Sequence, residues 1–335
     1  MESNGALLEV EGLNVGFKTD DGILMAASDI NFYIRSGETL AMVGESGSGK
    51  SVTALAIMRL HPKTARIAGR ARLLGKDLLA MSDDEMREVR GNDISMIFQD
   101  PMTALNPVFT VGSQIVEAIR IHQNVSKDLA WSRAVDLLAL VGVPEPKRRA
   151  AQYPHEFSGG MRQRAMIAMA IANDPKLLLA DEPTTALDVT VQAQVMEVIA
   201  DVQKATGAAV LLITHDLGLV AGSADRVQVM YASRIFESGS LEDIFYSSSN
   251  PYTQALMASI PAVTTRTHQR LASIPGNPPS LLKPPPGCPF MPRCSMAIEG
   301  CDDGIPASVE VAPAHFSRCI RAEEFRLAGA GGVAR

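Results

Sequence analysis

The sequence of 335 residues contains no long hydrophobic segment. Its longest apolar runs, such as residues 208–213, have the length of a strand, whereas a membrane-spanning helix needs about 18 consecutive apolar residues. Residues 1–4 lack the basic start and the apolar core of a secretory signal peptide. We therefore expect a chain that stays in the cytosol.

The sequence also lacks an excess of positive charge and any internal repeat. Lys and Arg number 31 against 37 Asp and Glu, and the net charge is −6. This balance argues against non-specific binding to nucleic acid. With 46% hydrophobic residues, the chain can bury the core of one large domain and that of a smaller one.

The composition changes near residue 260. Residues 1–259 alternate strand-like and helix-like segments, which is typical of an α/β fold with much parallel pairing. The following stretch is rich in proline, at Pro275, Pro278, Pro279, Pro284, Pro285, Pro286, Pro289 and Pro292. Such a density excludes long helices and central strands. We predict one domain over 1–259 and a small one over 260–335.

A glycine-rich octet is the most informative segment of the chain. It consists of Gly44, Glu45, Ser46, Gly47, Ser48, Gly49, Lys50 and Ser51. An apolar strand is predicted before it, over 39–43, and a helix after it, over 52–58. A strand that enters a helix through such a turn directs backbone N–H groups at one point, where phosphate binds. A glycine-rich turn without a ligand is the alternative.

Two side chains of the octet add to the case for a nucleoside triphosphate. Lys50 can reach the β- and γ-phosphates, and the Ser51 hydroxyl can bind Mg²⁺. The octet alone leaves kinases, GTPases and ATPases open.

Asp181 and Glu182 follow the apolar strand predicted over 177–180. In phosphate-binding enzymes of this kind the first carboxylate helps to hold Mg²⁺, and the second can polarise the attacking water. Two acids in a solvated turn are the alternative.

Two more segments extend the pattern. His215 follows the apolar strand predicted over 208–214, at a sheet edge where ligands bind, so we favour a γ-phosphate contact over a structural role. Ser158 can cap a helix whose first residues are Gly159 and Gly160, which leave the amides bare for an anion. The alternative is an ordinary helix start.

Together these segments resemble the ATPase subunit of ATP-binding cassette (ABC) transporters, and they occur in that family's order. The matches are residues 44–51 with the Walker A loop, Gln99 with the Q-loop, residues 158–160 with the signature loop, Asp181 and Glu182 with the Walker B Asp and the catalytic Glu, residues 186–188 with the D-loop, and His215 with the switch histidine.

The resemblance implies a P-loop fold with a mixed sheet and a helical subdomain over about 100–172. It implies ATP hydrolysis with Mg²⁺, for which Gln99 is a further ligand, and ATP contacts from Ser158, Gly159, Gly160 and Asp188. Phe17 matches the aromatic residue that stacks on adenine, although it could equally be a core residue. In the family each ATP lies between the Walker A loop of one subunit and the signature loop of another, so a monomer is expected to hydrolyse ATP poorly.

A closer resemblance is to the ATPases of dipeptide and oligopeptide importers. It rests on residues 98–107, 181–189 and 250–256 and on the cysteine-containing tail. It implies a different ATPase as dimer partner, two integral membrane permease subunits, an external substrate-binding protein, and a place at the cytoplasmic face of the inner membrane. Nickel, glutathione or haem are rival cargoes. A soluble cassette ATPase without a membrane partner is the rival function.

All four cysteines, Cys288, Cys294, Cys301 and Cys319, lie in the tail. In a cytosolic protein, clustered cysteines suggest metal before disulfide. No C-x₂-C pair occurs, and four thiolates suit either Zn²⁺ or a [4Fe–4S] cluster. Unligated thiols remain an alternative. The resemblance implies the [4Fe–4S] cluster.

We expect His315 to lie on the surface. The alternative is that it acts as a metal ligand in place of a cysteine. We also expect the cluster to have a structural role, because the tail lies far in sequence from every phosphate-binding segment.

Overall fold

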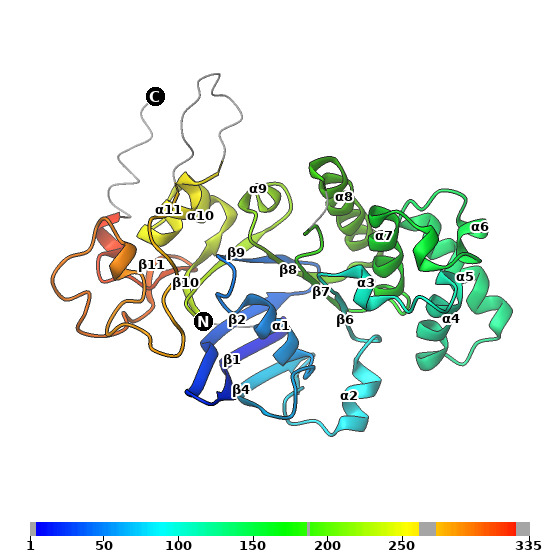
Figure 1. Ribbon diagram of the computed structural model, residues 1–335, viewed down its shortest axis with the longest axis horizontal. Helices are drawn as coiled ribbons and strands as arrows, with labels where there is room; N and C mark the ends of the chain where they lie inside the picture. The colour runs from blue at the N-terminus through cyan, green and yellow to red at the C-terminus, as the bar shows by residue number, and fades with distance from the viewer. Residues whose placement is uncertain (1–4, 186–187, 261–272, 326–335) are drawn as a thin grey trace, which may run out of the picture.

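The computed structural model describes residues 5–185, 188–260 and 273–325. A large mixed sheet crosses the molecule, a smaller antiparallel sheet lies beside it, and a group of helices occupies one end (Figure 1). None of the helices in these three stretches is long and apolar enough to cross a membrane.

The large sheet has eight strands in the order β11-β12-β10-β9-β3-β8-β7-β6. Its strands are β3 (Thr39–Val43), β6 (Ile94–Ile97), β7 (Leu177–Asp181), β8 (Ala209–Thr214), β9 (Arg226–Tyr231), β10 (Arg234–Ser240), β11 (Val309–Ala312) and β12 (His315–Ser317). The five strands from β9 to β6 are parallel, and β10, β12 and β11 continue the sheet antiparallel. The strands predicted before the octet, before Asp181 and before His215 are therefore confirmed, and they are neighbours.

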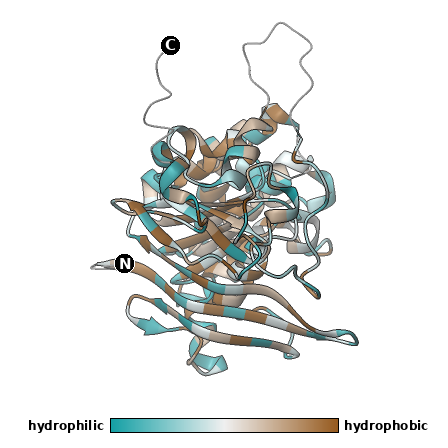
Figure 2. Cartoon of the chain, turned by 90° about the vertical axis from the view of Figure 1, so that its left-hand side faces the viewer, coloured by the Kyte–Doolittle hydropathy of each residue, from teal (hydrophilic) through white to brown (hydrophobic). Residues whose placement is uncertain are grey.

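The small sheet is antiparallel, in the order β2-β1-β4-β5. Its strands are β1 (Ala6–Thr19), β2 (Gly22–Arg35), β4 (Ala65–Leu73) and β5 (Lys76–Asp77). Hydrophobic and hydrophilic residues alternate along its long strands, because one face packs on the core and the other faces solvent (Figure 2). The pattern of the sequence predicts parallel pairing but not this separate layer.

Helices α3 to α7 form a group at one end of the molecule, over the interval in which a helical subdomain is expected (Figure 1). The helices are α1 (Lys50–Ile57), α2 (Asp83–Val89), α3 (Pro101–Ala104), α4 (Val111–His122), α5 (Lys127–Leu140), α6 (Pro146–Ala150), α7 (Gly159–Ala170), α8 (Val189–Thr206), α9 (Leu217–Val220), α10 (Leu241–Tyr246) and α11 (Pro251–Ala258), with 3₁₀ turns η1 (Pro154–Glu156) and η2 (Met291–Arg293).

Three buried clusters hold these layers together. One joins the helical group to β7 and β8, and includes Ile115 and Leu178. A second lies between the two sheets around α1, and includes Ile57. The third joins β9, β10 and α11 to the C-terminal segment, with Tyr252 and Phe290 in contact. Burial on both faces explains why the parallel strands are continuous apolar runs rather than alternating ones.

The C-terminal segment 273–325 is part of this framework. Its strand β12 pairs with β10, which extends the large sheet. His315, in β12, has 1% of its surface exposed, and its Nε2 lies 2.8 Å from Glu237 Oε1 in β10. The expectation that His315 is a surface residue is therefore wrong. The domain boundary near Ser259 stays a prediction, because residues 261–272 lie outside the described part.

Candidate functional site

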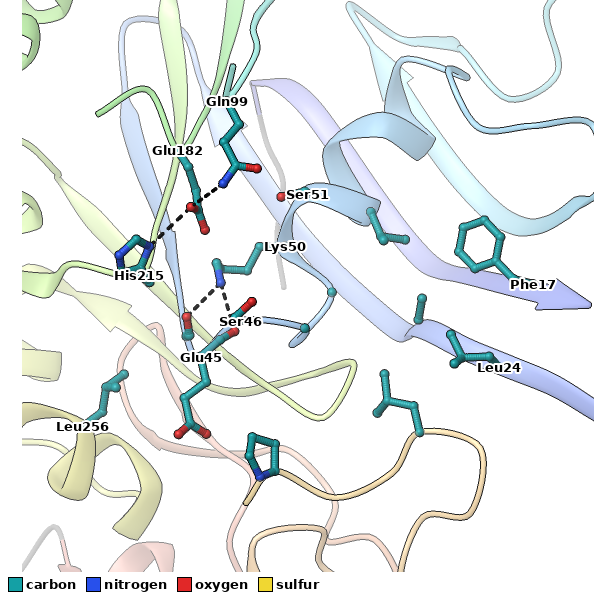
Figure 3. Close-up of a pocket in the computed structure, with 17 residues that line it drawn as sticks. Phe17, Leu24, Glu45, Ser46, Lys50, Ser51, Gln99, Glu182, His215 and Leu256 are labelled. Carbon is teal, nitrogen blue, oxygen red and sulfur yellow. Dashed lines mark hydrogen bonds and ion pairs between the residues drawn. The ribbon is translucent and has the colours of Figure 1, made fainter. Parts of the chain in front are cut away.

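A cavity of about 860 Å³ opens at the carboxyl ends of the parallel strands. Strands β3, β6, β7 and β8 all end at this edge, so the residues that follow them converge, as ligand sites in such sheets do. The cavity is lined by these residues among those that the sequence singled out: Phe17, Gly44, Glu45, Ser46, Gly47, Gly49, Lys50, Ser51, Gln99, Glu182 and His215. Figure 3 shows them around the loop that joins β3 to α1.

That loop depends on two glycines at its ends. Gly44 has a φ of 151°, and a Cβ there would lie 2.1 Å from the carbonyl oxygen of Met230 in β9. Gly49 has a φ of 104°, and a Cβ would lie 2.3 Å from the carbonyl oxygen of Ala26 in β2. Both approaches are too close for any side chain, so only glycine permits this path. The N-terminus of α1 consequently points its unpaired N–H groups into the cavity.

Lys50 is the first residue of α1 and has 4% of its surface exposed. Its Nζ donates hydrogen bonds to the carbonyl oxygens of Gly44 at 2.8 Å and Glu45 at 3.0 Å. Burial lowers the pKa of Lys50, while Glu182, Asp181 and Glu45 act in the opposite direction. The ammonium group is thus held where a phosphate at the helix N-terminus would meet it.

Ser51, the second residue of α1, meets Asp181 at the end of β7. The Ser51 hydroxyl donates a hydrogen bond to Asp181 Oδ1 at 2.7 Å. Burial raises the pKa of Asp181, and the bond from Ser51 partly offsets this effect. A hydroxyl and a carboxylate side by side are hard oxygen donors of the kind that suits Mg²⁺.

Glu182, the next residue, receives three polar contacts on one oxygen. Its Oε2 accepts hydrogen bonds from Gln99 Nε2 at 3.0 Å and Thr185 Oγ1 at 2.8 Å. His215 Nδ1 lies 3.3 Å from the same oxygen (Figure 3).

The backbone of Glu182 lies in the left-handed region, with a φ of 45°. A non-glycine residue there costs about 1–3 kcal/mol and persists only where its surroundings impose it. Here the N–H of Glu182 donates to the carbonyl oxygen of Ile213 at 2.9 Å, which ties the turn to β8. The strained turn directs this carboxylate into the cavity beside Lys50.

The opposite end of the cavity is apolar. Phe17 and Leu24 line it, from β1 and β2 (Figure 3). The Phe17 ring packs edge-on against His61, with 5.3 Å between ring centres, and it also contacts the buried cluster around α1. Phe17 thus lines the cavity and also packs against the edge of the hydrophobic core. Its stacking on adenine stays a prediction.

The remaining predicted nucleotide contacts do not reach this cavity. Ser158 caps α7 by accepting a hydrogen bond from the N–H of Met161 at 3.3 Å, as its sequence context predicts, and it is exposed together with Gly159. Asp188 caps α8 by accepting from the N–H of Val191 at 3.0 Å. None of residues 158–160 or Asp188 lines the cavity that contains Lys50. The other D-loop residues, 186 and 187, lie outside the described part of the chain.

The cavity is also lined by residues that no sequence pattern marks. Pro278 and Leu281, from the C-terminal segment, line the same cavity as Lys50. The C-terminal segment, although far in sequence from the phosphate-binding loop, thus contributes side chains to the same cavity. No local pattern marks Pro278 or Leu281, since each is an ordinary residue in a proline-rich stretch.

The four cysteines gather elsewhere, around a small cavity of about 20 Å³. The N–H of Cys288 donates to the carbonyl oxygen of Cys301 at 2.8 Å, which closes the loop between them. Burial raises the pKa of the Cys288 and Cys294 thiols, and it raises that of Cys319 to about 11. Within the described stretches, no three His, Cys, Asp or Glu side chains form a group that could hold a metal ion. The four cysteines thus line one cavity.

Comparisons with known proteins cover nearly the whole chain. The family model described as "ABC transporter" matches residues 27–185, and "Oligopeptide/dipeptide transporter, C-terminal region" matches 236–301. The "Probable peptide ABC transporter ATP-binding protein y4tR" of Sinorhizobium fredii is 51% identical over 329 residues, which are 97% of this chain and 98% of that protein. The "Oligopeptide transport ATP-binding protein OppD" of Bacillus subtilis is 52% identical over 312 residues, 92% of this chain and 87% of that protein.

Solved structures resemble the larger part of the chain. The dimeric post-hydrolysis state of the ATP-binding cassette MJ0796, bound to ADP and Pi, has a TM-score of 0.63 and 27% identity, and covers 70% of this chain and 98% of that one. CbiO1 from Clostridium perfringens, part of the ABC transporter complex cbiONQ, has a TM-score of 0.61 and 27% identity, and covers 72% of this chain and 91% of that one.

Proposed function

The chain belongs to the family of ABC transporter ATP-binding proteins, and on this premise we propose that it powers the import of peptides from the cytoplasmic face of the cell membrane. It is an ATP-hydrolysing subunit. The proposal of a peptide cargo rests on the match of residues 236–301 to the oligopeptide/dipeptide transporter C-terminal region. In addition, the two relatives described above match nearly all of this chain, and both are named as ATP-binding proteins of peptide transport.

The geometry supports a division of labour among the residues of the cavity. Lys50 and the N–H groups of α1 bind the β- and γ-phosphates. Ser51 and Asp181 would hold Mg²⁺, which when bound neutralises phosphate charge. Glu182 orients and polarises the attacking water. Gln99 donates to Glu182, so it fixes the direction of that carboxylate; its contact with Mg²⁺ remains a proposal.

A complete nucleotide site needs a second ATPase subunit. The exposed N-terminus of α7, with Ser158 and Gly159, has bare N–H groups that can bind an anion from another molecule. We propose that it covers the Walker A loop of a partner ATPase, while the partner's signature loop covers Lys50. Following the resemblance, the partner is a different ATPase, and the pair docks on two permease subunits served by an external binding protein.

The assembled transporter tests this function. Co-expressed with its permease subunits and embedded in lipid vesicles, the complex should hydrolyse ATP faster when peptide-loaded binding protein is added. Stimulation by nickel, glutathione or haem and not by peptide would show that one of these is the cargo instead. A chain that purifies alone with full activity would favour the rival, a cassette ATPase without a membrane partner.

The four cysteines support a second proposal, a [4Fe–4S] cluster. In such a cluster each cysteine binds a different iron, so the thiols surround the cluster, whereas zinc needs all four sulfurs about 2.3 Å from one point. Cys288, Cys294, Cys301 and Cys319 all line one small cavity. Arg318 and Arg321 line that cavity too and would balance the negative charge of a thiolate-bound cluster.

The cluster proposal has a direct test. Protein purified without oxygen should be brown and contain about four irons per chain. Replacing Cys294 with Ser should remove the colour. Colourless protein with one zinc per chain would favour zinc, and protein without any metal would favour unligated thiols.

A further inference from the structure

The acidic side chain of the phosphate-binding loop is turned away from the phosphate site. Glu45 is the second residue of the loop, and its carboxylate points away from Lys50 toward the C-terminal segment (Figure 3). There it meets Arg293, whose Nη1 lies 2.6 Å from Glu45 Oε2 and whose Nη2 lies 2.9 Å from Oε1. Two parallel hydrogen bonds between a guanidinium and a carboxylate form the strongest and most directional kind of ion pair.

Arg293 is itself held in place. Its side chain has only 4% of its surface exposed. Its Nε donates to the carbonyl oxygen of Pro275 at 2.9 Å and its Nη1 to the Tyr231 hydroxyl at 3.2 Å. Its guanidinium carbon lies 5.8 Å from the centre of the Tyr231 ring. The guanidinium is therefore fixed in position before it pairs with Glu45.

The backbone of Glu45 is also fixed. Its N–H donates to the Tyr252 hydroxyl at 3.1 Å, and its carbonyl oxygen accepts from Lys50. Rotation of the side chain is then the main freedom that Glu45 retains, and the ion pair with Arg293 restricts this rotation. The charge of Glu45 is close enough to act on Lys50, since it opposes the lowering of the Lys50 pKa. A triphosphate bound at Lys50 would be repelled by the same charge if it were not neutralised.

We propose that Arg293 is a positioning residue of the nucleotide site, which neutralises Glu45 and keeps its carboxylate out of the space that the triphosphate occupies. Through this contact the cysteine-containing segment becomes part of the ATP site. The inference rests on the ATP-binding part of the proposed function and is independent of the cargo.

Affinity for a non-hydrolysable ATP analogue with Mg²⁺, measured by calorimetry on the full chain, tests the proposal. Arg293→Met removes the charge and keeps much of the apolar side chain, so binding should weaken about tenfold, the usual value of a charged hydrogen-bonded pair. Because the cause is the freed Glu45 charge, the double variant Glu45→Gln/Arg293→Met should return to within about threefold of the wild type. The loss in the single variant should also shrink at high salt.

Arg226→Met is the matched control. Arg226 pairs with Glu38 at 2.8 Å and lies over the Tyr33 ring, 4.1 Å from its centre, so it resembles Arg293 in burial and contacts. Glu38, however, precedes β3, at the opposite end of that strand from the phosphate-binding loop. Arg226→Met should therefore lower stability without changing affinity for the analogue.

The proposal is overturned if Arg293→Met binds the analogue as the wild type does. It is equally overturned if the double variant stays as weak as the single one, because the loss would then come from a disturbed C-terminal segment. Should Arg293→Met fail to fold, Arg293→Lys replaces it, with an expected loss of about threefold because lysine cannot form the paired bonds. A wild-type chain that binds no analogue would instead contradict the proposed function itself.

Discussion

The hydroxyl of Ser51 donates a 2.7 Å hydrogen bond to Asp181 Oδ1, although 130 positions separate the two residues. They meet because β3 and β7 lie on either side of β8 and run parallel to it, so the segments after them emerge at one edge. The bond places a hydroxyl and a carboxylate side by side, and these are oxygen ligands of the kind that suits Mg²⁺. Its partner Asp181 is buried, which makes this site sensitive to pH.

Acidification should weaken Mg²⁺ binding at a higher pH than an ordinary aspartate would allow. Burial raises the pKa of Asp181 in the folded chain, so protonated Asp181 favours folding below the unfolded-state pKa of about 3.9, and this benefit disappears as the pH rises through the higher folded-state value. Mg²⁺ needs the ionised form. Mg²⁺ should raise the unfolding midpoint, and this increase can be measured with an ATP analogue from neutral pH down to about pH 5. The increase should become smaller at a higher pH than protonation of an ordinary aspartate would cause.

Asp181→Asn provides the control for that measurement. It keeps the shape of the side chain but carries no ionisable group, so it should give little Mg²⁺ stabilisation at any pH. A variant that follows the same pH profile as the wild type would show that protonation of the nucleotide phosphates, and not of Asp181, sets the profile.

Replacing Glu182 with Gln should preserve ATP binding and slow hydrolysis in the assembled transporter by about 10²–10⁴-fold, the usual contribution of a positioned general base. Gln retains the hydrogen-bonding shape that Thr185 and Gln99 contact but cannot take a proton. Lys50→Ala is the contrasting variant and should weaken ATP binding itself. Near-normal turnover in Glu182→Gln would contradict the role of Glu182.

Replacing Gln99 with Ala should reduce peptide-stimulated hydrolysis more than it reduces ATP affinity. Gln99 lies at the start of the exposed segment that follows β6 and donates to Glu182, so we propose that it connects the permease subunits to this carboxylate. Thr185→Ala removes a bond to the same oxygen from a different loop. It should lower basal and stimulated rates in equal proportion. Equal effects of the two variants on stimulation would argue against a coupling role for Gln99.

Replacing Gly44 with Ala should abolish nucleotide binding and destabilise the fold by more than about 3 kcal/mol, because a Cβ 2.1 Å from the Met230 carbonyl oxygen forces the loop off β9. Gly47→Ala is the matched comparison in the same loop. Its φ is 76°, but a Cβ there has nothing within 4 Å, so only the backbone penalty of about 1–2 kcal/mol applies. Urea unfolding and ATP affinity measure both, and equal losses would contradict the packing argument.

The sequence alone locates the strands that lead to the nucleotide site. Continuous apolar runs before Gly44, before Asp181 and before His215 predict buried parallel strands, and these became β3, β7 and β8. Such runs are local, and parallel pairing places their carboxyl ends at one edge whatever the rest of the chain does. The glycines of the loop can also be recognised in the sequence. The close backbone approaches at Gly44 and Gly49 explain why no other residue fits there.

Other features depend on contacts that have no local signature. The burial of His315 follows from its pairing with Glu237, and the exposure of the signature loop follows from where the helical group lies. The clustering of the four cysteines in the tail indicates that they gather at one place, but their spacing alone does not distinguish zinc from a [4Fe–4S] cluster.

The clearest case is the pair formed by Glu45 and Arg293, which are 248 positions apart. Each residue is unremarkable in its own segment, one in a glycine-rich loop and the other in a proline-rich tail. Their contact exists because the third buried cluster, with Tyr252 and Phe290, packs the C-terminal segment against the end of β9. The local sequence thus predicts where phosphate binds, and only long-range side-chain packing decided that an arginine of the tail pairs with the acid in that loop.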